Sequence, residues 1–363
     1  MISAADRARG EALFEGLRAA GATPVSAPIL LEAGPLLDLY GEDIRARAFQ
    51  TQDPALGEMM LRPDFTVPVV RAHLESGATP ARYCYLGEVF RRQEDDPSRA
   101  REYLQVGYEI FDGSDPAAAD ADVFARIGEA LAPWSPVPAT GDLGLLIAAV
   151  EGLATTPRRR AALRRHIWRP TRFRRLTDRF TGRVAPDPDR AALLARLEHE
   201  TPEAIAAAAG PEAGLRSLDE VAARLTALAE DARTPPIPAA EADVLDRLLT
   251  LEGTMTGALG PLRDLATDLP ALRPAIDRLE ARAEAMARRG LAVDTLPFAP
   301  ARGRSTLEYY DGFTFTFTTP DRPGEPPLAT GGRYDALTAA LGGQGAIPAV
   351  GGVIRPGLLG ERP

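Results

Sequence analysis

Alternating apolar and polar residues are most regular between residues 61 and 112. Segments 82–92 and 101–112 carry Val, Ile, Tyr and Phe at alternate positions, which is typical of half-buried β-strands. Arg, Glu and Gln stand inside these same segments. Burying an unpaired charge costs several kcal/mol, so charges repeated along neighbouring strands indicate a polar cleft built on a sheet. The pattern therefore predicts a ligand site.

The same periodicities place the other elements of the chain. They predict helices at 4–20, 65–77 and 116–131, and further strands at 23–28, 49–53, 291–296 and 305–319. Phe65, Val69 and Leu74 form the apolar stripe of the second helix.

The character of the sequence changes at about residue 141. From there to residue 285, Ala, Leu, Arg and Glu follow helical spacing, and Pro-rich joints interrupt them. We therefore divide the chain into a core part at 1–140, a mainly helical insertion at 141–285 and a second core part at 286–363. A chain of 363 residues is long enough for one large domain with such an insertion.

One part of the insertion is strongly basic. Trp168 and Phe173 are interleaved with its arginines, which occupy positions 158–160, 164, 165, 169, 172, 174, 175 and 179. This segment is either a surface that binds an anion or a partner, or a solvated helix face balanced by acidic helices after it. We favour the solvated face.

Composition excludes several classes of protein. The sequence has no lysine, so it has no Walker A loop and no Schiff-base or pyridoxal-phosphate chemistry. The net charge of −9 argues against a nucleic-acid partner. No apolar run is long enough to span a bilayer, and the N-terminus follows an amphipathic helix pattern rather than that of a signal peptide. We expect a cytoplasmic protein.

Several ordered motifs resemble those of a known family. Phe90-Arg91-Arg92 and the strand from Gln105 to Glu109 resemble motif 2 of the class II aminoacyl-tRNA synthetases, specifically of histidyl-tRNA synthetase. Segments 306–317, 330–337 and 348–359 are similar, in the same order, to that family's histidine-recognition strands and motif 3 region. The resemblance covers nearly the whole chain except about 157–285. It implies an α+β fold, with a class II synthetase-like antiparallel sheet flanked by helices and a helical insertion.

The resemblance also implies a dimer and an amino-acid pocket. Residues near 23–28 look like motif 1, which forms the dimer interface in those enzymes. The implied histidine-binding residues are Asp64, Thr66, Arg91, Gln105, Glu109, Tyr309, Tyr310 and Tyr334. Carboxylate and amide oxygens at three of these positions can orient an α-ammonium or an imidazole N–H. The alternatives are an internal ion pair with a strand arginine for each carboxylate, and plain core packing for the tyrosines.

The nucleotide side of the resemblance is damaged. Ser305 stands where the family's histidine motif has an arginine thought to stabilise developing negative charge. Arg304 is one residue out of step, which on a strand turns its side chain to the opposite face. Leu358 stands at the position of the ATP-clamping arginine of motif 3, and Arg355 lies three positions early, before Pro356.

An intact amino-acid pocket, a degraded nucleotide site and no anticodon-binding domain after motif 3 resemble the regulatory subunits of ATP phosphoribosyltransferase. That resemblance implies a non-catalytic protein that the short-form catalytic subunit requires for activity, with histidine as the feedback effector. It implies no catalytic residue, metal, cofactor, tRNA or membrane partner. Two alternatives stay open: a truncated synthetase-like enzyme that forms histidyl-adenylate, and a pseudo-synthetase binding domain that serves another partner.

Overall fold

A nine-stranded sheet forms the centre of the molecule in the computed structural model, in the order β1-β5-β6-β12-β11-β10-β7-β9-β8. The structure describes residues 2–40, 44–93, 99–210, 216–304, 309–322, 324–342 and 345–360. The strands are β1 (Thr23–Pro24), β5 (Ala81–Phe90), β6 (Glu102–Phe111), β7 (Val137–Asp142), β8 (Gly253–Thr254), β9 (Pro297–Phe298), β10 (Phe313–Thr318), β11 (Ala329–Arg333) and β12 (Ala349–Ile354). Its pairings are antiparallel except β1–β5 and β7–β9. The predicted fold class is confirmed.

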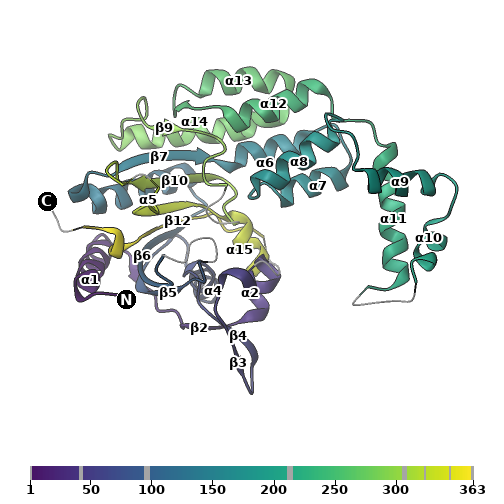
Figure 1. Cartoon of the computed structure of the whole chain (residues 1–363). Coiled ribbons are helices and arrows are strands. Elements are labelled where there is room, and N and C mark those ends of the chain that lie inside the picture. The colour runs from purple at the N-terminus through teal and green to yellow at the C-terminus, as the bar shows by residue number, and fades with distance from the viewer. Residues whose placement is uncertain are drawn as a thin grey trace.

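Helices cover both faces of the sheet (Figure 1). On one face lie α1 (Ala4–Ala19) and α5 (Pro116–Leu131), which pack against β5, β6 and β12. Near the opposite face lie α4 (Thr66–Ser76) and α15 (Asp335–Gly342), which contact each other. A smaller antiparallel sheet, β2-β4-β3, uses Leu30–Glu32, Gly57–Leu61 and Gln50–Asp53, with the short helices α2 (Ala33–Tyr40) and α3 (Ile44–Arg47) between its strands.

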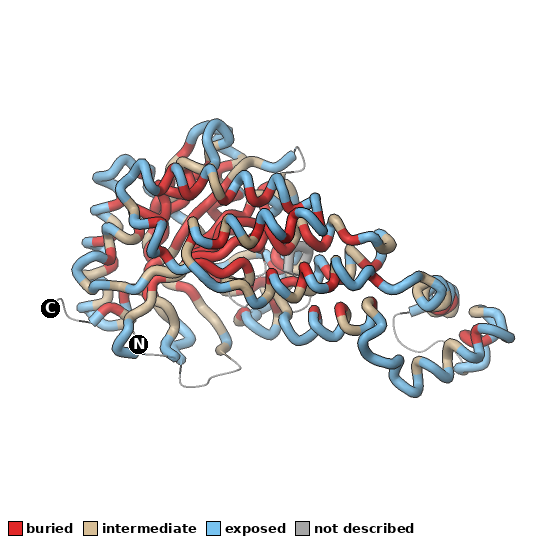
Figure 2. Tube along the Cα trace, turned by 90° about the horizontal axis from the view of Figure 1, so that it is seen from above, coloured by how far each residue is buried: buried red, intermediate tan, exposed pale blue. Residues whose placement is uncertain are grey.

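Most of the remaining chain is helical. Its helices are α6 (Leu143–Gly152), α7 (Pro157–Arg165), α8 (Pro170–Phe180), α9 (Pro188–Leu197), α10 (Pro202–Ala208), α11 (Leu218–Arg233), α12 (Ala239–Thr250), α13 (Leu259–Asp268) and α14 (Arg273–Arg288). Buried side chains of α6–α8 and α12–α14 belong to the same hydrophobic cluster as the sheet. Helices α9–α11, which we call the arm, have a separate small cluster of Leu197, Ile205, Ala206, Ala222 and Leu225. Figure 2 shows the arm projecting from the buried core with most of its surface exposed.

Local sequence signals explain where the best-predicted helices begin. Helix α1 begins with a capping box, in which Ser3 and Asp6 satisfy each other's backbone N–H groups. Helix α5 begins at Pro116, and Asp115 accepts a hydrogen bond from the backbone N–H of Ala118. The predicted helices at 4–20, 65–77 and 116–131 are all present, the last with its predicted bounds.

Three strand predictions need correction. Residues 291–296 form turns rather than a strand, because Val293 and Thr295 donate their backbone N–H groups to carbonyls two and three residues earlier. Only Thr23–Pro24 of the predicted strand 23–28 pairs with the sheet, and proline lacks the N–H that a ladder needs. The predicted strand 305–319 is reduced to Phe313–Thr318; its first four residues lie outside the described ranges.

One central strand was not predicted at all. Strand β7 (Val137–Asp142) pairs with β10 along its whole length, inside a segment whose two prolines and glycine do not read as a strand. The bounds of the predicted insertion remain a prediction, but α6–α8 and α12–α14 share the main core and only the arm has its own. No helix in the described ranges combines the length and apolar character that crossing a membrane requires.

Candidate functional site

The buried carboxylate of Glu109 is the centre of the candidate site. It lies on β6 with only 1% of its surface exposed. Tyr85 on β5 donates its hydroxyl to Oε1 at 2.9 Å, and Tyr334, after β11, donates to Oε2 at 2.7 Å. Glu109 forms no ion pair with any residue that the structure describes. The alternative of an internal ion pair with a strand arginine therefore does not hold for this carboxylate.

Two glycines provide the room that this arrangement needs. Gly351 on β12 is the register partner of Glu109, and a Cβ there would lie 1.3 Å from Glu109 Oε2. Gly107 on β6 is opposite Tyr85, and a Cβ there would lie 2.0 Å from the tyrosine ring. The glycine of the Gln105–Glu109 motif thus lets Tyr85 reach the carboxylate.

Gln105 adds an unsatisfied acceptor to the same face of β6. Residues four apart on a strand point to the same side, so Gln105 and Glu109 share a face. Gln105 is as deeply buried as Glu109, and no described group donates a hydrogen bond to its Oε1. Buried acceptors are normally satisfied, so this oxygen is available to an N–H donor from a ligand.

Asp64 and Thr66 come from the turn between β4 and α4. The backbone N–H of Thr66 donates to Asp64 Oδ1 at 3.2 Å, and the Thr66 hydroxyl lies 3.0 Å from that of Tyr309. Asp64 is buried and close enough to Glu109 for its charge to raise the pKa of that carboxyl group. The loop after β9 is thereby joined to the start of α4.

Three tyrosines form an aromatic wall beside the carboxylates. The ring centroid of Tyr309 lies 4.9 Å from that of Tyr310 and 6.0 Å from that of Tyr334, both in edge-to-face geometry. The backbone carbonyl of Tyr310 accepts a hydrogen bond of 3.1 Å from the indole of Trp168, which lies between α7 and α8. The basic part of the helical region therefore touches the tyrosine wall.

An adjoining cleft is lined by charged residues of both signs, with Arg91, Arg99 and Arg355 on the one hand and Asp6, Glu102 and Glu325 on the other. Its volume is about 790 Å³, and its lining includes Arg91, Tyr103, Thr330 and Arg355. Arg91 donates to the carbonyl of Pro63 at 2.9 Å, and its charge opposes the rise in the pKa of Asp64 that burial causes. Arg355 donates to Pro327 and Thr330, and its charge weakly opposes the rise in the pKa of Tyr310 that burial causes. The arginines are therefore placed where the cleft meets the buried carboxylates.

Burial dominates the electrostatics of the site. It raises the pKa of Glu109 to about 7, with a further rise from the charge of Asp64, although the two tyrosine hydrogen bonds oppose this. Burial also raises the pKa of Asp64, against the opposing effect of Arg91. Two carboxyl groups held in this way gain from a cationic ligand, because a positive charge between them offsets their desolvation.

The structure brings seven of the eight predicted site residues together as contacts or as electrostatic neighbours, and the eighth, Gln105, lies on the same face of β6 as Glu109. It also places Tyr85 and Thr330 there, which the sequence did not single out, and Arg355, which the motifs had placed out of step. The sequence signals that could have identified Tyr85 as a site residue were the alternation along β5 and the glycine opposite it. In the sequence, Arg355 lies three positions before the position of the family's motif 3 arginine. Its side chain nevertheless lines the cleft, since Pro356 only begins the short 3₁₀ helix Pro356–Leu358.

On the nucleotide side, the structure describes Arg304 and Leu358, two of the residues that the motif comparison singled out. Arg304 donates to the backbone carbonyl of Ile167 and lies over the ring of Phe173, so it is engaged with α7–α8. Leu358 lines the cleft with an apolar side chain. Ser305 lies outside the described residues.

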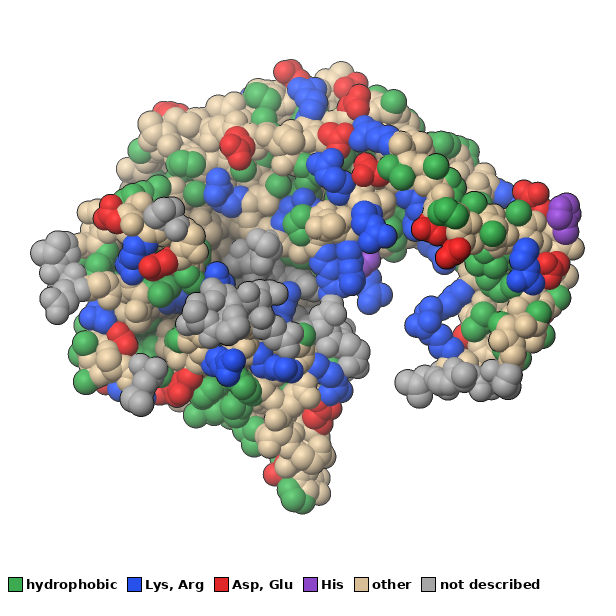
Figure 3. Space-filling view, in the orientation of Figure 1, with side chains coloured by type: hydrophobic (Ala, Val, Ile, Leu, Met, Phe, Trp, Pro, Cys, Tyr) green, Lys and Arg blue, Asp and Glu red, His purple; other side chains and the backbone are tan. Residues whose placement is uncertain are grey.

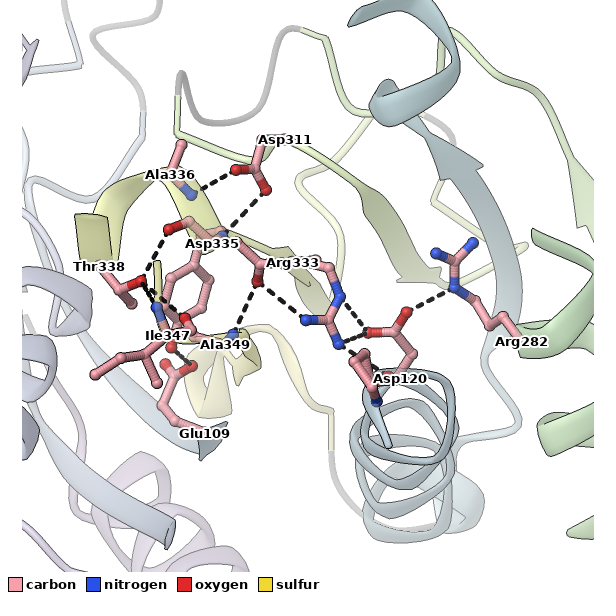
Figure 4. Close-up of polar contacts among 12 residues, drawn as sticks. Glu109, Asp120, Arg282, Asp311, Arg333, Asp335, Ala336, Thr338, Ile347 and Ala349 are labelled. Atoms are coloured by element: carbon pink, nitrogen blue, oxygen red, sulfur yellow. Dashed lines mark hydrogen bonds and ion pairs between the residues drawn. The ribbon is translucent and has the colours of Figure 1, made fainter. Parts of the chain in front are cut away.

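A second buried polar cluster, which we call the charge network, adjoins the site (Figure 4). Asp120 on α5 accepts hydrogen bonds from Arg333 at 2.7 Å and from Arg282 on α14 at 2.7 Å. Arg282 also donates to Asp142 at 2.7 Å, and Arg333 to Asp335 at 3.0 Å. Arg333 directly precedes Tyr334, so the network and the Glu109 site share a strand end.

The mainly antiparallel sheet with helices on both faces is the fold of a class II aminoacyl-tRNA synthetase-like protein. The sequence profile described as histidyl-tRNA synthetase matches residues 3–235 and 222–356. A solved structure titled as an ATP phosphoribosyltransferase regulatory subunit/histidyl-tRNA synthetase from Bacillus halodurans has a TM-score of 0.66 at 20% identity, covering 98% of this chain and 77% of the other. That likeness shows the fold.

The curated relatives identify the family more specifically than the solved structure does. The ATP phosphoribosyltransferase regulatory subunit of Brucella anthropi is 35% identical over 361 residues, covering 93% of this chain and 94% of the relative. The protein of the same name from Brucella canis is 34% identical over 358 residues, covering 94% and 93% respectively. This chain belongs to the family of ATP phosphoribosyltransferase regulatory subunits, which confirms the resemblance drawn from the motifs.

Proposed function

We propose that this chain is the regulatory subunit of ATP phosphoribosyltransferase, the enzyme that opens histidine biosynthesis, and that it binds histidine in the Glu109 site. The names of its relatives support the subunit assignment. One observation supports the choice of ligand: Glu109, Gln105 and Asp64 are buried acceptors, and among the described residues Glu109 has no ion-pair partner and Gln105 Oε1 has no donor. A ligand with an ammonium and an imidazole N–H meets that need.

The charges at the cleft fit the other end of an amino acid. Arg91 and Arg355 line the cleft beside the site, and we assign them to the carboxylate of the ligand. Guanidinium groups bind carboxylates in a fork geometry. A zwitterion thus finds acceptors in the buried part of the site and donors at the mouth.

The regulatory role follows from a pocket that binds without performing chemistry. The short-form catalytic subunit is the proposed partner, and this chain would act as a dimer built through the motif 1 region. Histidine would shift the partner's conformational equilibrium with a coupling of about 1–3 kcal/mol, which is typical of allosteric effectors.

Reconstitution tests this proposal. The purified chain is mixed with a short-form catalytic subunit, and phosphoribosyl transfer is measured with and without histidine. We expect activity to require this chain and histidine to suppress it. The variant Glu109→Gln should still activate but should respond only to higher histidine. A catalytic subunit with the same rate and histidine sensitivity in the presence and absence of this chain would exclude the proposal.

A further inference from the structure

The boundary between the arm and the main body contains a small arginine-lined cavity. Helices α7 and α8 contribute Arg158, Arg159 and Arg179, while α9 and α11 of the arm contribute Arg190 and Asp231. The cavity has a volume of about 190 Å³. Four guanidinium groups therefore surround a space whose lining contains one carboxylate.

That carboxylate is already engaged by two of the arginines. Asp231 accepts a bond of 2.6 Å from Arg159 and one of 3.0 Å from Arg190. Arg159 also donates to the backbone carbonyls of Asp231, Thr234 and Pro235 at the end of α11, so its role is structural.

Arg158 and Arg179 have no ion-pair partner of their own in the described part of the chain. Among the described residues, neither side chain forms a hydrogen bond or an ion pair. The guanidinium of Arg179 lies over the ring of Phe180 at 4.7 Å, which places it beside the cavity. Burial and then the charge of Arg190 lower the pKa of Arg179; the charge of Asp231 opposes this, and Arg159 and Arg158 add smaller lowering effects. The arginines thus repel one another.

The charge distribution of the surrounding segment also favours the binding of an anion. Residues 157–190 contain twelve arginines and three aspartates, although the whole chain has a net charge of −9. Figure 3 shows arginine side chains on both sides of the hollow between the main body and the arm. An anion in this region would meet an attractive field from both walls.

We propose that this cavity binds a small phosphate-type oxyanion, with inorganic phosphate or pyrophosphate as the simplest forms. Phosphate oxygens accept paired hydrogen bonds from guanidinium groups and offset their mutual repulsion. The enclosed volume suits the oxyanion alone better than a nucleoside or a polynucleotide.

The bound anion would act as a link between two parts of the fold. Its ligands would come from α7 and α8 on the main body and from Arg190 on the arm. The arm has only a small hydrophobic cluster of its own and joins the main body through residues 181–187 and 234–238. Binding should therefore stabilise the arm more than the sheet.

The first test measures binding to the full-length chain. Isothermal titration with inorganic phosphate and with pyrophosphate, at constant ionic strength in chloride, should give saturable binding at millimolar concentrations or below. The double variant Arg158→Gln, Arg179→Gln should weaken it by roughly tenfold or more, as expected for lost charge-assisted bonds. The matched control Arg172→Gln, Arg175→Gln removes two exposed arginines of α8 that do not line the cavity, and should bind as the wild type does.

The second test follows hydrogen exchange in the arm. Pyrophosphate should slow amide exchange in α9–α11 of the wild type and of the control, but not of the Arg158/Arg179 variant. Equal weakening by both double variants would reduce the effect to general charge screening and overturn the proposal. Binding of oligoribonucleotide without any binding of phosphate or pyrophosphate would also overturn it, in favour of a polynucleotide surface.

Discussion

The charge network and the Glu109 site are two buried polar regions that share the end of β11 but differ in their balance of charge. In the network, Asp120 and Asp142 each meet an arginine at 2.7 Å, and Arg333 bridges Asp120 and Asp335. In the site, tyrosine hydroxyls are the only donors to Glu109 among the described residues, and Gln105 Oε1 has no described donor. Glu109, Gln105, Asp120, Asp142 and Arg282 are all buried, whereas Asp335 at the edge of the network is partly exposed.

The difference teaches how to separate a structural polar cluster from a ligand site. A network whose charges are compensated within the protein holds α5, α14 and the sheet together. A buried carboxylate such as Glu109, which has no cation paired with it among the described residues, keeps a desolvation cost that folding does not offset. Binding of a cationic ligand would offset this desolvation cost. Four experiments test this interpretation.

The largest expected effect is on stability. Replacing Arg282 by Ala leaves Asp120 and Asp142 buried with one fewer partner, so unfolding in urea should show a loss of about 3–5 kcal/mol. The control Arg263→Ala removes an exposed partner of Glu280, and its effect should be small. A similar loss in both variants would show that the network is no more structural than a surface pair.

The next effect is on ligand affinity. Glu109→Gln keeps the size of the side chain but removes its charge, so histidine binding should weaken by about 1.5–3 kcal/mol, or ten- to a hundredfold by isothermal titration. Glu75→Gln changes an exposed carboxylate on α4 and serves as the control. Unchanged binding in Glu109→Gln would place the effector elsewhere in the fold.

The pH dependence of stability gives a smaller effect. Glu109 has its pKa raised from 4.5 to about 7, so the folded state holds a proton that the unfolded state has lost between these values. Stability from this group is therefore full below about pH 4.5 and falls as pH rises toward 7.

Urea denaturation across this range checks the sign. The wild type should become less stable relative to Glu109→Gln as pH rises, because only the wild type ionises at this position. The opposite slope would mean that Glu109 is ionised and compensated in the apo protein, as in the charge network.

The smallest expected signal is catalytic. Arg304 is engaged with Ile167 and Leu358 is apolar, so the chain alone should not exchange pyrophosphate into ATP in the presence of histidine. Readily measured, histidine-dependent exchange would turn the proposed effector site into an active site and would favour the adenylate-forming alternative.

The sequence predicted those parts of the molecule that obey a single periodicity. The strands β5 and β6 and the helix α5 alternate or repeat cleanly, and their bounds were found to within about a residue or two. Strand β7 was missed because Pro138 and Gly141 interrupt its pattern, although β10 holds both residues in register. Residues 291–296 were wrongly predicted as a strand because their apolar spacing reflects two buried turn residues, Val293 and Leu296.

The motifs predicted part of the candidate site, but they did not predict which other residues contact it. Gln105 and Glu109 were visible as polar residues in an apolar strand. Tyr85 was not, since a tyrosine in a strand is ordinary until the glycine opposite it is known. The charge network joins residues more than a hundred positions apart, such as Asp120 and Arg282. No local sequence pattern predicts such a pair.

The hydrogen bond from Trp168 to the carbonyl of Tyr310 also gives the protein a natural optical probe. The chain has two tryptophans, and Trp134 instead donates to the carbonyl of Gly360. Indole emission responds to the polarity and geometry of its hydrogen bond, so a ligand that displaces the loop at Tyr310 alters the emission of Trp168 while Trp134 supplies a steady background. Ligand binding beside the tyrosine wall can therefore be followed by tryptophan fluorescence, without a label and without the catalytic partner.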